Sequence, residues 1–240
     1  MNLKYIIAST GRSGTVYMAR LLTSVGVPCG HESIFTWQGI EKAKNILCDS
    51  HKPNLSYTSS MDFVDGIWIP KEKWLENIDK IEAESSYMAV PFLSDECLKD
   101  TKIIHVVRNP IKVINSFCNH IGYFKEKTPQ NIYEEFIYSF LPELKEEMSY
   151  YERSSLYYIR WNQLIEKSNP DLFHRIEDNP IKIFDFINKN GDYFNDKKIN
   201  TYKSRTNDYF NLHKIQSEII KSELIQIMKK YNYSMGANFL

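Results

Sequence analysis

A glycine-flanked loop near the start of the chain has the residue types of an anion site. Residues 10–15 read Thr-Gly-Arg-Ser-Gly-Thr and directly follow the apolar run 6–8. Small residues let the backbone N–H groups of such a turn approach an anion, and the positive end of a following helix favours the same charge. Gly11 and Gly14 are too close for the nucleotide-kinase loop, which has four residues between its glycines. That loop also ends in Gly-Lys-Ser/Thr, whereas Thr15 directly follows Gly14 here. We expect a phosphate-like ligand other than ATP.

A second anion-binding group follows the apolar, β-branched run 103–107. Arg108 comes at the end of this predicted central strand, and Pro110 suits the first turn of a helix because its missing N–H costs nothing there. Ser116 lies on the same predicted helix, eight residues after the arginine. Because an arginine can bind a phosphate through two hydrogen bonds, this unit predicts a second phosphate contact.

Two residues that could accept a proton follow the first predicted helix. His31 and Glu32 come after the short extended segment 27–30, just beyond a strand end. In open α/β sheets that edge is where ligands bind. Both side chains are candidate general bases, and the sequence leaves the choice between them open.

The elements that must position these residues alternate between strand and helix. The pattern predicts strands at 3–9, 87–90, 103–107 and 172–176, and helices at 14–25, from 110 onward, and at 131–150, 154–168, 180–189 and 215–231. Residues 38–80 are expected to hold helix and loop. Such alternation favours an α/β fold with a central, mainly parallel sheet flanked by helices. At 240 residues, we expect one domain over 1–240.

Composition excludes several partners. Thirty basic and thirty acidic residues cancel, so no general attraction to nucleic acid is expected. No stretch approaches the roughly 18 apolar residues of a membrane span, and no signal peptide is evident, so we expect a cytoplasmic protein. The four cysteines are widely spaced and are expected to be reduced. No metal cluster is indicated, and the oligomeric state stays open.

The two strand-turn-helix units together resemble the sulfotransferases that use 3′-phosphoadenosine 5′-phosphosulfate (PAPS). Weaker similarities follow in the order seen in bacterial members of that family, so the resemblance spans nearly the whole chain; they lie at residues 30–32, 160–165, 175–178 and 231–233. The resemblance implies the P-loop NTPase-like architecture of the sulfotransferases. It also implies that PAPS is the sulfuryl donor and that no metal is required.

The resemblance assigns roles to the residues of both loops. The first loop and the residues after it would hold the 5′-phosphosulfate; they are Gly11, Arg12, Ser13, Gly14, Thr15, Val16 and Tyr17. Val16 and Tyr17 depart from the family, where many members have Thr and Trp. Arg108 and Ser116 would hold the 3′-phosphate, and Arg205 is expected to cover it. Arg12 would also stabilise the negative charge that builds on the leaving phosphate.

By the same resemblance, Glu32 is the preferred general base and His31 is its rival. The implied reaction is in-line transfer of a sulfuryl group to an acceptor hydroxyl, with release of adenosine 3′,5′-bisphosphate. The acceptor would be a small molecule or a glycan. Two alternatives remain: a P-loop kinase of a small molecule that uses ATP and Mg²⁺, and a non-catalytic nucleotide-binding protein of the same fold.

Overall fold

The computed structural model describes residues 3–48, 61–64, 67–70, 81–121, 123–189 and 210–234. The chain forms two compact units, each assembled from two segments. The first unit comprises residues 1–106 and 165–203, and the second comprises residues 107–164 and 204–240.

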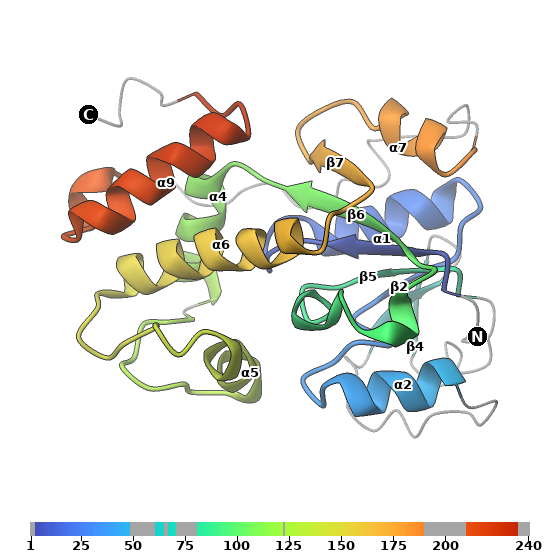
Figure 1. The fold of residues 1–240 in the computed structure, drawn as a ribbon, viewed down its shortest axis with the longest axis horizontal. Helices are drawn as coiled ribbons and strands as arrows, with labels where there is room; N and C mark the ends of the chain where they lie inside the picture. Colours follow the sequence, from blue (N-terminus) through green and yellow to red (C-terminus); the bar gives the residue numbers. More distant parts are fainter. Residues whose placement is uncertain are drawn as a thin grey trace. The chain divides into compact units, whose positions relative to one another are not determined.

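A five-stranded sheet is the centre of the first unit (Figure 1). Its strands are β1 (Tyr5–Ala8), β2 (Cys29–His31), β5 (Ala83–Ser85), β6 (Lys102–Val107) and β7 (Leu172–Arg175), in the order β2-β5-β1-β6-β7. β1 pairs in parallel with both β5 and β6, and β2 pairs in parallel with β5. The prediction of an α/β fold with a mainly parallel sheet is confirmed. The carboxyl ends of β1, β5 and β2 therefore meet at one edge of the sheet.

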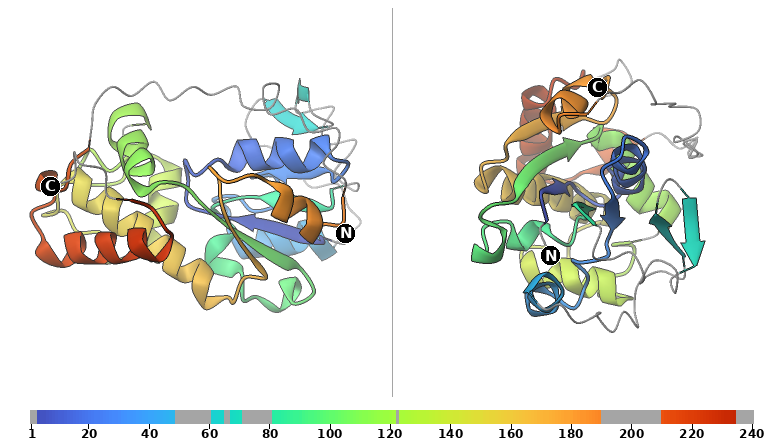
Figure 2. Two further views of the ribbon diagram at one scale, coloured as in Figure 1. Left: turned by 90° about the horizontal axis from the view of Figure 1, so that it is seen from above. Right: turned by 90° about the vertical axis from the view of Figure 1, so that its right-hand side faces the viewer.

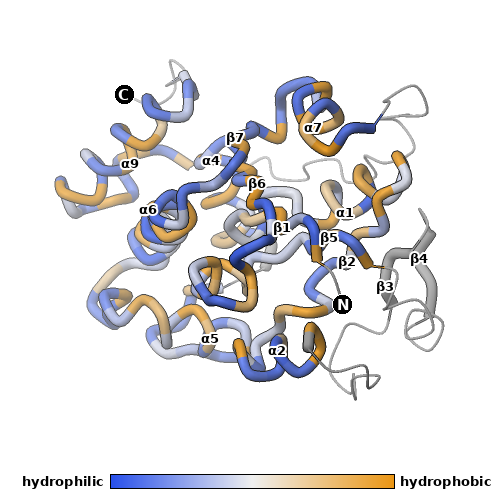
Figure 3. The backbone as a smooth tube through the Cα atoms, turned by 45° about the vertical axis from the view of Figure 1, so that its right-hand side comes forward, coloured by the Kyte–Doolittle hydropathy of each residue, from blue (hydrophilic) through white to orange (hydrophobic). Residues whose placement is uncertain are grey.

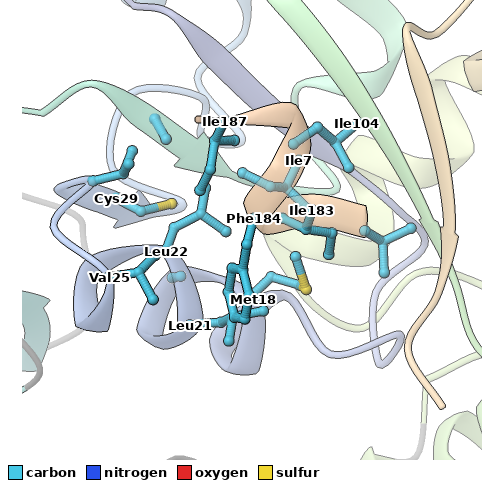
Figure 4. Packing of buried hydrophobic residues seen from close by; sticks show 14 residues of the cluster. Ile7, Met18, Leu21, Leu22, Val25, Cys29, Ile104, Ile183, Phe184 and Ile187 are labelled. Atoms are coloured by element: carbon cyan, nitrogen blue, oxygen red, sulfur yellow. The ribbon is translucent and has the colours of Figure 1, made fainter. Parts of the chain in front are cut away.

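Two helices bury their apolar sides on the same face of this sheet. They are α1 (Thr15–Ser24) and α7 (Ile181–Phe186). Leu22 and Met18 of α1, Phe184 of α7 and Ile7 and Ile104 of the strands belong to one cluster of buried side chains (Figure 4). Burial of such side chains contributes on the order of 1.5–3 kcal/mol each, so this packing fixes where α1 begins relative to β1.

One predicted strand is wrong. Residues 87–90 were expected to be extended, but the strand is β5 at 83–85, and Val90–Phe92 form a single 3-10 turn, η2. The apolar residues 87–90 are buried as expected, yet they pack from a turn. The strand itself contains Glu84 and Ser85, both fully buried, so it lacks the apolar pattern by which a central strand is recognised.

The remaining elements of the first unit lie in or near the region where helix and loop were expected. They are α2 (Ile40–Cys48), the antiparallel pair β3 (Met61–Val64) and β4 (Ile67–Pro70), and the 3-10 turn η3 (Glu96–Leu98). The β3 and β4 hairpin was not predicted. Figure 2 shows α2 and α1 on opposite sides of the sheet.

The second unit is helical. It contains α4 (Pro110–Asn115), which continues into a π-helical turn η4 (Ser116–Ile121), α5 (Ile132–Phe140), most of α6 (Tyr150–Lys167), the 3-10 turn η6 (Leu212–Lys214) and α9 (Glu218–Lys230). Hydrophobic and hydrophilic residues alternate along α9 (Figure 3), as in an amphipathic helix. The aromatic side chains of Phe117, Tyr157 and Trp161 pack in the core of the second unit, with successive ring centroids 5.2 Å apart.

Candidate functional site

The anion loop, residues 10–15, turns from β1 into α1 through Gly14. This residue has φ 96° and ψ 29°, in the left-handed region that favours glycine. A Cβ at this position would also lie 2.9 Å from Cδ1 of Ile176. No side chain caps the N-terminus of α1. Because a helix leaves the N–H groups of its first turn without partners inside the helix, this end of α1 is suited to an anion.

The polar side chains of the anion loop hold its shape. The hydroxyl oxygens of Thr10 and Ser13 lie 2.5 Å apart in a hydrogen bond, and the N–H of Ser13 donates to the carbonyl of Thr10 at 3.2 Å. Both side chains are buried. Arg12, between them, has φ 66°, an uncommon conformation for a residue with a Cβ. The side chain of Arg12, which the sequence predicts to stabilise a leaving phosphate, is half-buried in this loop.

The anion loop and the two candidate bases lie at the same edge of the sheet. Oγ1 of Thr15 shares a hydrogen bond with Nε2 of His31 at 2.9 Å. The same nitrogen lies 3.7 Å from Oε1 of Glu32. The three side chains therefore form a continuous polar row from the first residue of α1 to the residues after β2.

The environment of His31 favours its neutral form. Burial and, to a smaller extent, the nearby positive charge of Arg20 together lower its pKa from 6.5 to about 4. Arg20 is itself buried on α1 and was not singled out from the sequence. At neutral pH the ring of His31 is uncharged, and its Nε2 is already bonded to Thr15. This arrangement suits a positioning role better than that of the principal base.

Glu32 begins a turn, residues 32–35, that we name the base turn. It has φ 52°, again in the left-handed region, and its side chain is 23% exposed. Its N–H donates to the carbonyl of Ser85 at 3.3 Å, so the end of β5 fixes its backbone. A strained residue that keeps an accessible carboxylate beside an anion loop is a candidate for chemistry.

Sequence reasoning missed the residues that hold this turn. The N–H groups of Ser33 and Ile34 donate to Oε1 of Glu84 at 2.5 and 2.9 Å. Burial raises the pKa of Glu84 from 4.5 to about 8, although these N–H groups and that of Phe35 act in the opposite direction. The one signal available was the run 84–86, Glu-Ser-Ser, next to an apolar stretch.

The second predicted group, Arg108 and Ser116, belongs to the second unit. Arg108 follows β6 directly, and its carbonyl accepts a hydrogen bond from the hydroxyl of Tyr158 at 2.9 Å. Ser116 is buried at the point where α4 passes into the π-helical turn. Such turns are frequent at functional sites. Arg205 lies outside the described residues.

The described ranges contain neither a candidate metal centre nor a candidate membrane span. Among those residues, no group of His, Cys, Asp and Glu is arranged to hold a metal ion. The helices of the same ranges are all too short or too polar to cross a membrane.

Comparison with known proteins gives a family and a fold. The family model described as "Sulfotransferase domain" matches residues 3–232. The solved structure titled "Sulfotransferase Domain from the Curacin Biosynthetic Pathway" matches with a TM-score of 0.51 and 15% sequence identity, over 98% of this chain and 99% of that one. At that identity the match shows a shared fold. No curated protein sequence matches the chain. With the family match covering nearly its whole length, the chain belongs to the sulfotransferase domain family.

Proposed function

We propose that this protein transfers the sulfuryl group of PAPS to an acceptor hydroxyl and releases adenosine 3′,5′-bisphosphate. The observation that carries the proposal is the polar row at the edge of the sheet. Thr15 of the anion loop, His31 and Glu32 follow one another at 2.9 and 3.7 Å. A helix start suited to an anion thus lies directly beside a carboxylate, which supports the proposal because transfer to a hydroxyl needs a group that accepts a proton.

The residues of the anion loop fit a phosphosulfate. The uncapped start of α1 supplies backbone N–H groups and the positive end of the helix dipole. Arg12 supplies a planar, permanently charged guanidinium that would stabilise charge on the departing phosphate. PAPS, when bound, supplies an activated sulfuryl group. Gly11, Ser13 and Gly14 would surround its phosphosulfate, while Val16 and Tyr17 would line the first turn of α1.

Glu32 is the proposed general base, and His31 its positioning partner. The carboxylate of Glu32 is accessible, whereas Nε2 of His31 is occupied by the hydroxyl of Thr15. A positioned base contributes roughly 10²- to 10⁴-fold to such a rate. The acceptor is proposed to be a small molecule or a glycan that carries a hydroxyl.

Arg108 and Ser116 are proposed to bind the 3′-phosphate, with Arg205 covering it. A bidentate hydrogen bond from a guanidinium to a phosphate is among the stronger polar contacts in proteins. This contact would make the protein distinguish adenosine 3′,5′-bisphosphate from adenosine 5′-monophosphate. A kinase would instead bind ATP with Mg²⁺ more tightly than either of these compounds.

Thermal stabilisation by nucleotides tests the donor. Wild-type protein should melt at a higher temperature with adenosine 3′,5′-bisphosphate than with adenosine 5′-monophosphate or with ATP and Mg²⁺, because tight binding stabilises the folded state by mass action. Arg108→Met should remove the difference between the two adenosine compounds. Lys112→Met, which removes an exposed charge from α4, the helix that follows Arg108, should leave it intact.

Transfer itself is measured with sulfur-labelled PAPS and a panel containing p-nitrophenol, a glucosamine oligosaccharide and a tyrosine peptide. Labelled product from at least one acceptor supports the proposal. Stabilisation by ATP and Mg²⁺ above the other nucleotides would overturn it in favour of a kinase. Nucleotide binding with no labelled product from any acceptor would favour a non-catalytic binding protein.

A further inference from the structure

The end of β5 carries three consecutive buried polar residues, Glu84, Ser85 and Ser86, for which the proposed function has no use. All three are fully buried. Buried polar groups are costly unless they are hydrogen-bonded, so such a run in the middle of a sheet needs a reason. We propose that these residues form a positioning segment that fixes the base turn and the start of α1 relative to each other. This proposal rests on the proposed role of Glu32.

Two residues of the positioning segment hold the base turn by its backbone. Oε1 of Glu84 accepts the N–H groups of Ser33 and Ile34, the two residues that follow Glu32. The hydroxyl of Ser86 donates to the carbonyl of Phe35 at 3.3 Å. The turn is thus held through two of its backbone N–H groups and one of its carbonyls, directly after the residue in the left-handed conformation.

Ser85, the remaining residue of the positioning segment, holds the start of α1. The hydroxyl of Ser85 donates to the carbonyl of Thr15, the first residue of α1, at 2.9 Å. The carbonyl of Ser85 accepts the N–H of Glu32. One residue of β5 therefore connects the anion loop to the base, and a displacement of β5 would alter the separation of the two groups.

The neighbourhood of Glu84 shows that its place is built for the carboxyl group. A Cβ at residue 30 would collide with Oε2 of Glu84, so Gly30 leaves the space that this oxygen occupies. Oε2 has no hydrogen-bond partner among the described residues. Because Glu84 is fully buried, it acts through the base turn and is a positioning residue.

Amide hydrogen exchange tests the contact without any use of activity. With ¹⁵N-labelled serine and isoleucine, the amides of Ser33 and Ile34 should be protected in the wild-type protein. They should stay protected in Glu84→Gln, whose amide oxygen can still accept both bonds, and lose protection in Glu84→Ala. Rapid exchange of both amides in the wild-type protein would overturn the positioning proposal. This result does not depend on whether the proposed function is correct.

Kinetics test the consequence. Glu84→Ala should lower kcat by about a hundredfold while the KM for PAPS stays near its wild-type value, because a small misplacement of a reacting group has an effect of this size. Glu84→Gln should keep most of the wild-type kcat. If Glu84→Gln is as slow as Glu84→Ala, or if Glu84→Ala keeps the wild-type kcat, the positioning role is wrong.

A serine pair supplies a matched control, and it keeps the test usable should Glu84→Ala not fold. Ser85→Ala removes a buried hydrogen bond to the carbonyl of Thr15, and Ser155→Ala removes a similar buried bond to the carbonyl of Tyr151 in α6. Both variants should lose a similar amount of stability, but only Ser85→Ala should lower kcat with little change in the KM for PAPS. An equal kcat in the two variants would contradict the proposal.

Discussion

Two turns of this protein place a residue with a side chain in the left-handed region and hold it with a buried glutamate. In the first unit, Glu32 has φ 52° and the N–H groups that follow it donate to Glu84. In the second unit, Phe124 has φ 64° and its own N–H donates to Oε1 of Glu134 at 2.6 Å. Such a conformation costs on the order of 1–3 kcal/mol and persists only where surrounding bonds hold it.

The two turns differ in the number of carboxylate oxygens that accept hydrogen bonds. Both oxygens of Glu134 accept backbone N–H groups, because Oε2 takes that of Gln130 at 2.7 Å. One oxygen of Glu84 has no partner among the described residues. The held residues differ as well, since Phe124 is fully buried whereas the side chain of Glu32 is partly exposed.

The difference separates a turn that serves packing from a turn that lies at the candidate site. The turn at Phe124 inserts a large apolar ring into the core of the second unit, where it packs 5.6 Å from the ring of Phe117 and 5.5 Å from that of Tyr157. The turn at Glu32 instead keeps a carboxylate accessible beside an anion loop. Similar backbone chemistry thus serves packing in one unit and a candidate site in the other.

The largest expected effect is on the rate of transfer. Glu32→Gln keeps the shape of the side chain and its left-handed backbone but removes the proposed base, so it should lower kcat by about 10²-fold or more. The melting temperature and the affinity for adenosine 3′,5′-bisphosphate, measured by calorimetry, should not change. If transfer survives in this variant, the base is His31 or another group, and the turn at Glu32 does not serve to present the base.

The second expected effect is on stability and concerns the other turn. Arg153 is buried and donates to the carbonyls of Phe124, Glu126 and Met148 at 2.7, 2.9 and 2.7 Å. Arg153→Met leaves these acceptors without their donor and should lower the free energy of unfolding by about 2–4 kcal/mol. Chemical denaturation measures this loss. The KM for PAPS of the folded protein should stay unchanged; a large rise in KM would contradict the structural assignment.

The smallest expected effect is a dependence of stability on pH. The pKa of Glu84 is raised from 4.5 to about 8, so between these values the folded state keeps a proton that the unfolded state has lost. The folded state then binds more protons, and this group's contribution to stability falls as pH rises through that range. Glu84→Gln cannot titrate, so its melting temperature should rise relative to that of the wild-type protein as pH increases from about 4.5 to about 8. A melting temperature of Glu84→Gln that changes with pH as that of the wild-type protein does would contradict this assignment to Glu84.

Much of the fold could be predicted because local sequence patterns indicate its strands and helices. The apolar runs before residue 9 and at 103–107 are strands β1 and β6, and Pro110 begins α4 as expected. Tyr157 and Trp161 are buried in the core of the second unit, as large aromatic side chains usually are. The strand placed at 87–90 was wrong because apolar character was taken for extended structure, while the real strand contained buried polar residues.

The sequence by itself determined the anion loop, the family and the candidate bases, because these depend on neighbours in the chain: glycine spacing, a strand before it and a helix after it. Only the tertiary structure decided that Thr15, His31 and Glu32 form one row, and that Glu84 holds the turn beside it. Glu84 and Ser33 are 51 residues apart in the chain, and a bond between them leaves no periodic pattern. The packing of β5 between β1 and β2 brings them together.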